Sequence, residues 1–125
     1  MPRENSLAPA KWVRIAEKDL KRAGLLLNAE DPEGAGFNLQ QAVEKFLRAF
    51  LLARGWKLKR THDLEALLDA AIVYEPTLAQ FRPACQEISN YYLVERYPGP
   101  QASAPSLVDV EASFQAVSAL IDRLR

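Results

Sequence analysis

Apolar residues recur at every third or fourth position along most of this chain, and no run of any length alternates between apolar and polar residues. The first spacing lines up side chains on one face of an α-helix, whereas strict alternation is typical of a half-buried β-strand. The segments with helical spacing cover about residues 9–28, 36–54, 62–74, 77–95 and 106–124. The pattern therefore predicts an all-α fold.

The breaks between the first segments carry residues that interrupt helices. Pro32, Gly34 and Gly36 separate the first and second helices. Gly55 follows the second helix, at a position where glycine commonly ends an α-helix in a left-handed conformation. Because short connections favour antiparallel neighbours, the sequence predicts an up-and-down antiparallel bundle of four to five helices.

Hydroxyl residues precede the later helices. Thr61 and Thr77 stand at the starts of the third and fourth helices, where their side chains would accept hydrogen bonds from free N–H groups, and the fifth helix starts at Ser106. Pro83 then falls inside the fourth helix, where proline removes a hydrogen bond. Two alternatives follow for this segment: a kinked helix, or a helix that begins later than residue 77.

The second helix has the most apolar stripe, so we place it at the centre of the bundle. Its stripe consists of Leu39, Val43, Phe46, Leu47, Phe50 and Leu51. The chain has 125 residues, of which 49% are hydrophobic, and it contains no repeat. These values predict a single domain over the whole chain, with its core at about residues 10–124.

The fifth helix carries a narrow apolar seam, which we assign to the monomer core rather than to a coiled-coil dimer. The seam consists of Leu107, Val110, Phe114, Val117, Ile121 and Leu124. Cys85 lies in the apolar register of the fourth helix, and we interpret it as a small core residue rather than a nucleophile.

Composition argues against several classes of function. The chain has 16 basic and 16 acidic residues, whereas proteins that bind nucleic acids generally carry a basic excess. Its single cysteine and single histidine, His62, cannot form a Cys/His zinc cluster, and we expect no metal or cofactor. The N-terminus lacks the apolar core of a signal peptide, and no apolar run approaches the ~20 residues of a membrane span. We expect a cytoplasmic protein with no membrane partner.

Polar residues follow a helical spacing on the second helix, within FNLQQAVEKFLRAFL at residues 37–51. Gln41 and Lys45 lie one turn apart, as do Gln40 and Glu44. One interpretation is a solvated strip. The other follows from a central position of this helix, since polar groups there would face another element, another chain or a cleft and would need hydrogen-bond partners.

Two further motifs lie at helix ends. In RTHDL, His62 and Asp63 start the third helix, where free N–H groups attract anions; local capping is the alternative. In ERYPGP, Pro98 disfavours helical geometry at the preceding residue, so the fourth helix should stop at about Arg96. Helix termination accounts for the arginine but does not account for Tyr97.

The expected topology brings these ends together. In an up-and-down bundle the second and fourth helices run toward the same end, from which the third helix starts. Arg54, His62 and Arg96 would therefore cluster there. Such a cluster, with a tyrosine and a helix N-terminus nearby, is typical of a phosphate or nucleotide pocket.

These motifs also resemble a known family. The segments NLQQAVEKFLRAFLLARG, THDLEALL and SNYYLVERYPGP, in this order and spacing, are similar to the HEPN (higher eukaryotes and prokaryotes nucleotide-binding) domain over about residues 10–122. The resemblance implies a bundle of four or five helices that often dimerises. Small members are commonly paired with a minimal nucleotidyltransferase as a toxin–antitoxin module, and some members are metal-independent endoribonucleases.

The resemblance to the ribonuclease members is incomplete. Those members carry an arginine that is followed a few residues later by a histidine, and no histidine follows Arg96 in this chain. RNA cleavage needs a proton donor and acceptor as well as charge stabilisation, so we assign no catalytic residue. A ribonuclease toxin that uses His62 instead, and a purely structural dimer or adaptor, are the alternative hypotheses.

The leading hypothesis is a dimeric HEPN-type module that binds a nucleotide or phosphate-bearing ligand and acts with a nucleotidyltransferase partner. RNA is a less favoured ligand. The candidate binding residues are Arg96, Tyr97, His62 and Asp63, with Lys45 and Gln41 from the second helix.

Overall fold

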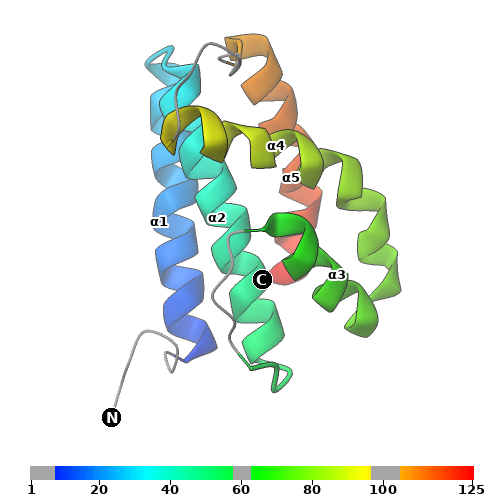
Figure 1. The fold of residues 1–125 in the computed structure, drawn as a ribbon. Helices are drawn as coiled ribbons and strands as arrows, with labels where there is room; N and C mark the ends of the chain where they lie inside the picture. The colour runs from blue at the N-terminus through cyan, green and yellow to red at the C-terminus, as the bar shows by residue number, and fades with distance from the viewer. Residues whose placement is uncertain (1–7, 58–62, 97–104) are drawn as a thin grey trace.

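A computed structural model of the protein describes residues 8–57, 63–96 and 105–125, with the backbone alone described at 92–96. Over these residues the chain forms an all-α bundle without strands, as the sequence predicts (Figure 1). The elements are α1 (Pro9–Asn28), α2 (Pro32–Leu52), α3 (Leu64–Tyr74), the 3₁₀ helix η2 (Pro76–Phe81), α4 (Arg82–Arg96) and α5 (Leu107–Leu124). None of the described helices is long and apolar enough to cross a membrane.

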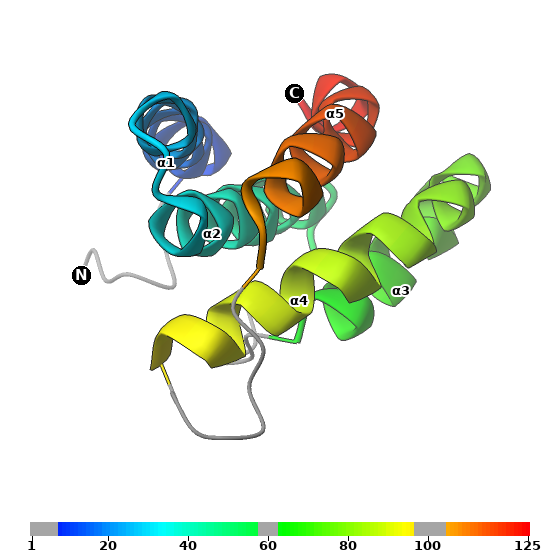
Figure 2. The ribbon, with the colours of Figure 1, turned by 90° about the horizontal axis from the view of Figure 1, so that it is seen from above.

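The central position predicted for the second helix is confirmed. α2 buries 13 of its 21 residues. It packs against α1, α3, α4 and α5, and its interface with α1 is the largest in the described structure. Seen from above, α2 lies between α1 and α4 (Figure 2). The core is therefore built around one helix whose surface is enclosed on several sides.

The start of α2 differs from the prediction. Asp31 caps the helix by accepting a 3.0 Å hydrogen bond from the Gly34 backbone N–H, and Pro32 occupies the first turn, where its missing N–H group costs nothing. Gly34 and Gly36 therefore lie inside the helix, and the predicted break at these residues is wrong. Local propensity disfavours glycine there, but Gly36 is buried against Tyr91 of α4, where a larger residue would not fit. At the other end, Gly55 has the expected positive φ, 83°.

Asp63 forms the cap of α3 that the sequence assigned to Thr61. Its carboxylate accepts hydrogen bonds from the backbone N–H groups of Glu65 and Ala66, at 3.0 and 3.4 Å. Helix α3 accordingly begins at Leu64, two residues later than predicted. Thr61 lies outside the described residues.

The fourth predicted helix is divided into two elements. A 3₁₀ helix ends at Phe81 and α4 begins at Arg82, so Pro83 lies in the first turn of α4. The alternative of a later helix start is therefore correct. Thr77 is not a cap, since it lies within η2 and its hydroxyl oxygen accepts a 2.7 Å hydrogen bond from Arg123.

Helix α5 starts as predicted, because the Ser106 hydroxyl accepts a 3.0 Å hydrogen bond from the Asp109 backbone N–H. Its seam packs into the monomer core through Val110, Val117, Ile121 and Leu124, which confirms that assignment. Leu107 is an exception: it remains 36% exposed in the first turn. Cys85 is fully buried in the core, as expected.

Candidate functional site

A row of polar side chains lies inside the protein on the central helix. Gln40, Glu44 and Arg48 occupy successive four-residue positions of α2, and their exposed fractions are 1%, 3% and 5%. Residues four apart are neighbours on a helix surface, so the three form one continuous line. The sequence left open whether this strip is solvated or enclosed, and the structure shows that these three positions are enclosed.

The row connects the contacts that α2 makes with two other helices. Gly36, one turn before Gln40, lies against the ring of Tyr91 in α4. At the other end, the guanidinium carbon of Arg48 lies 5.9 Å from the ring centroid of Trp12 in α1. Four-residue rows are inclined to the helix axis, which is why one row passes from the α4 side of α2 to the α1 side.

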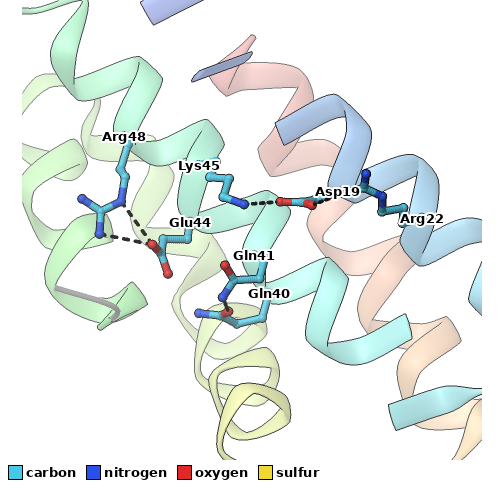
Figure 3. Close-up of polar contacts among 7 residues, drawn as sticks. All are labelled: Asp19, Arg22, Gln40, Gln41, Glu44, Lys45 and Arg48. Carbon is cyan, nitrogen blue, oxygen red and sulfur yellow. Dashed lines mark hydrogen bonds and ion pairs between the residues drawn. The ribbon is translucent and has the colours of Figure 1, made fainter. Parts of the chain in front are cut away.

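Glu44 and Arg48 form an ion pair within the row (Figure 3). The Arg48 Nε and one terminal nitrogen each lie 3.2 Å from Glu44 Oε2, and the side chains are only 6% and 4% exposed. Charge-assisted hydrogen bonds offset part of the desolvation of these groups. Apolar residues of similar volume often stabilise a core as well as such a pair does, so stability alone does not account for a buried ion pair.

A second ionic contact joins α2 to α1. Lys45 donates to Asp19 with an Nζ–Oδ2 distance of 2.5 Å, and Arg22 lies 3.4 Å from the other carboxylate oxygen. Asp19 is 5% exposed. Figure 3 shows Lys45 directed toward α1, whereas Glu44 and Arg48 project from a different side of α2. The positive charge of Lys45 is thus already balanced within the chain.

Asp19 was missed at the sequence level. It stands three residues after Ala16 and four before Ala23, both fully buried, so it occupies the buried face of α1. A carboxylate in an apolar register is the signal that would have identified it, since a buried charge requires a partner.

The two adjacent glutamines are also bonded to each other. Gln41 Nε2 donates to Gln40 Oε1 at 2.8 Å, and Gln41 is half-buried. Of the candidate binding residues on α2, Gln41 and Lys45 are therefore both held by neighbours in the same chain. A ligand would contact them only by replacing these partners.

The other candidate residues lie at helix ends. Asp63 is exposed and caps α3. Arg96 is the last residue of α4, and only its backbone is described. His62 and Tyr97 lie outside the described residues. Arg96 stands five residues after Tyr91, or roughly 7 Å along the helix, and Tyr91 contacts Gly36, one turn before the polar row.

Arg54 does not lie at the end of α2 that α4 approaches. Tyr91, late in α4, contacts Gly36 near the beginning of α2, and α2 continues for roughly 24 Å beyond Gly36. Arg54 follows that far end, where it donates a 3.0 Å hydrogen bond to the Phe50 carbonyl and stacks on the Phe50 ring at 3.5 Å. The expected cluster of Arg54 with Arg96 is therefore wrong, because α4 runs opposite to α2 rather than parallel to it.

Two further features concern the reactive side chains of the described residues. No group of three or more His, Cys, Asp and Glu side chains in the described parts of the chain is arranged to hold a metal ion. Burial raises the pKa of the Cys85 thiol to about 12, outweighing the opposing charge of Arg82. Cys85 is thus a packing residue, because the thiolate is the reactive form of cysteine.

Comparison with known proteins gives these features a family context. The model of the HEPN domain matches residues 10–125. This chain belongs to the HEPN family. A solved structure with a similar arrangement of helices along nearly the whole chain is that of TT1696 from Thermus thermophilus, with a TM-score of 0.72 and 25% sequence identity. The match covers 93% of this chain and 94% of TT1696. A comparison with curated proteins found no match.

Within this HEPN domain α1 and α2 carry two ion-paired groups. Asp19 of α1 contacts Arg22 and Lys45, and Glu44 pairs with Arg48 on α2. Because Lys45 belongs to α2, the Asp19–Lys45 contact holds α2 against α1.

Proposed function

We propose that this HEPN protein is a binding module that takes a nucleotide or another phosphate-bearing ligand near the C-terminal end of α4. One observation carries the proposal: the central helix has a buried polar row, Gln40, Glu44 and Arg48, that begins one turn after Gly36, the residue that Tyr91 of α4 contacts. Ionic groups inside a domain are often no better for stability than apolar residues. A polar row that starts one turn from this contact with α4 supports a site for a polar ligand near that helix.

In this proposal Arg96 and Tyr97 bind the ligand directly. A guanidinium pairs with two phosphate oxygens at once, which gives arginine both charge and geometry for this task. A tyrosine ring offers a stacking surface for a base, and its hydroxyl is a further hydrogen-bond donor. His62 supplies an additional donor to phosphate.

The residues bonded within the chain have supporting roles. The Asp63 carboxylate already accepts from two N–H groups at the start of α3, so it holds the helix start in place and does not bind an anion. Gln41 and Lys45 keep the polar side of α2 oriented through Gln40 and Asp19. Substitution of these residues should weaken ligand binding less than substitution of Arg96.

The protein partners in this proposal are a second copy of the chain and a minimal nucleotidyltransferase, in a toxin–antitoxin-like pair. Membership of the HEPN family supports this part. Affinity capture of the tagged protein from its native host tests it, with proteins and small molecules identified together. If no nucleotidyltransferase is enriched over a tagged control protein, this part of the proposal fails.

Isothermal titration with ATP, GTP, CTP, UTP, their monophosphates and inorganic phosphate tests the ligand site. We expect Arg96→Ala to weaken binding at least about tenfold, since a lost charge-assisted contact costs ~1.5–3 kcal/mol. Arg14→Ala is the matched control because Arg14 is an exposed arginine on α1. No binding by the wild-type protein, or equal binding by Arg96→Ala, would refute the site.

A further inference from the structure

A groove of about 530 Å³ lies between α4 and α5, with η2 closing one end. None of the described residues that line it belongs to α1 or α2. Its floor and edges carry small side chains, Ala84 from α4 with Ala112, Ser113 and Ala116 from α5. Small residues let the backbone of another segment approach closely, so the groove has room for a whole segment of another chain and not only for single side chains.

Exposed apolar residues follow one side of α5 at the groove. Ala112 and Ala116 line the groove and Val108 lies one turn before Ala112, so the three form one row along the helix. Val108 is 76% exposed, and both alanines are also exposed. A groove between two helices with such a row has the form that receives the apolar face of a third helix.

The walls of the groove are acidic. Glu87 projects from α4 and Asp109 from α5, and no lysine or arginine is among the described residues that line the groove. The Tyr91 hydroxyl, 2.9 Å from Ser113 Oγ, ties the two walls together. An occupant that matches these walls has apolar residues on its inner face and basic residues on both sides of that face.

A second copy of this chain matches the groove poorly. Within the described part of the chain, a basic surface lies on the outer face of α1, where Lys11, Arg14, Lys18 and Lys21 are exposed at helical spacing. This face supplies positive charge but only one exposed apolar side chain, Leu25. Because no residue of α1 is among the described residues that line the groove, contacts between α1 of one copy and the groove of another would join copies head to tail rather than close a two-fold dimer.

We propose that the α4–α5 groove docks a basic amphipathic helix from a partner protein. Apolar residues of that helix, one turn apart, pack on Ala112 and Ala116, and flanking lysine or arginine residues pair with Glu87 and Asp109. The inference goes beyond the proposed nucleotide site and shares no residue with it. The inference assigns the proposed binding of a protein partner to the α4–α5 groove, and it predicts that the docked segment of the partner is positively charged.

The test uses a 14-residue peptide of leucine and lysine, LKKLLKLLKKLLKL, and the matching peptide with glutamate in place of lysine. Titrations are followed by calorimetry and by amide chemical shifts of the full-length protein. We expect the lysine peptide to bind and to shift amide signals of α4 and α5, while the glutamate peptide does not bind. Equal binding of both peptides, or shifts confined to other helices, overturns the proposal.

Two pairs of variants make the test specific. Ala116→Trp fills the groove and Glu87→Lys reverses one wall charge, and each should weaken binding at least about tenfold. Ala119→Trp and Glu111→Lys are the matched controls, because these exposed residues on α5 do not line the groove. The affinity of these two variants for the lysine peptide should stay within about twofold of wild type. Unchanged binding by Ala116→Trp, or equal losses in the controls, contradicts the proposal.

Two further measurements separate this inference from other outcomes. Sedimentation of the chain alone reports self-association, and a dimer that Ala116→Trp dissociates would show a second copy in the groove and overturn the assignment. Nucleotide titration of Ala116→Trp should match wild type, because the groove is separate from the end of α4. If the wild-type protein binds no nucleotide, the proposed nucleotide site fails, but binding of the lysine peptide to the groove is unaffected.

Discussion

The ring of Tyr91 in α4 lies so close to Gly36 in α2 that a Cβ atom on residue 36 would stand 2.9 Å from Cγ of the ring. The ring has little freedom to move away, because its hydroxyl is 2.9 Å from Ser113 Oγ on α5. Gly36 therefore sets the separation of α2 and α4. Tyr91 also links α4 to α5 through its contact with Ser113.

Substitution of this glycine by alanine should destabilise the fold. Alanine favours a helix by ~1 kcal/mol over glycine, but overpacking of a core typically costs ~1–3 kcal/mol. We expect Gly36→Ala to lower the free energy of unfolding by up to about 2 kcal/mol in urea titrations. Gly24→Ala is the control: its nearest atom would be 3.9 Å away, so it should stabilise the protein by about 0.5–1 kcal/mol. A stabilised Gly36→Ala would contradict the role assigned to the Tyr91 contact.

Removal of both members of the Asp19–Lys45 pair should cost less than the sum of the two single removals. Asp19 is 7% exposed at its side chain, and Asp19→Asn leaves the Lys45 ammonium without its anion. We expect losses of about 2 kcal/mol for Asp19→Asn and for Lys45→Met, and a coupling energy of about 1–3 kcal/mol from the double-mutant cycle. Arg22→Ala should cost less than about 0.5 kcal/mol, because that side chain is 63% exposed. Additive losses would show that the two residues do not interact.

The contact between Glu17 and Arg125 should make stability depend on acid pH. The hydrogen bond from Arg125 is the main cause that lowers the pKa of Glu17 below its usual 4.5. A lowered folded-state pKa contributes stability that is complete above pH 4.5 and is lost as pH falls through the folded-state value. We expect Arg125→Gln to raise the pKa of Glu17 toward 4.5 in a carboxyl NMR titration and to flatten the acid-side loss of stability. Arg123→Gln should leave the Glu17 titration as it is in wild type.

Cys85 should resist thiol reagents while the protein is folded. Burial raises its pKa to about 12, so almost no thiolate exists at pH 8, and the side chain is fully enclosed. We expect a chromogenic disulfide to react with this thiol only as fast as the protein unfolds, and at once in strong denaturant. The destabilised Gly36→Ala variant should react faster than wild type, whereas rapid labelling of native wild type would contradict the assignment of Cys85 to the core.

Sequence reasoning succeeded where the deciding interactions are local. Apolar spacing gave the positions of the helices because each stripe belongs to one helix, and the Ser106 cap depends on a residue three positions away. The same reasoning failed at Gly36, where helix propensity predicts a break but a contact with residue 91 decides the structure. It also failed for the direction of α4, which no local pattern determines.

The candidate site shows the same division. The spacing of Gln40 and Glu44 was visible in the sequence, but their burial depends on how the other helices cover α2. The Asp19–Lys45 contact joins residues 26 positions apart, so it requires the register between α1 and α2. The assignment of Arg96, Tyr97 and His62 to ligand binding stays a prediction from the motifs and the family.

The pairing of α1 with α2 also bears on the order in which the protein folds. These helices share the largest interface, yet only residues 29–31 separate them in the chain. Closing so short a loop costs little entropy, and the Asp19–Lys45 contact lies inside this hairpin. We therefore expect the α1–α2 hairpin to be the first part of the protein to fold. Docking of Tyr91 onto Gly36 must bring together residues 55 positions apart, which makes it a later and slower event.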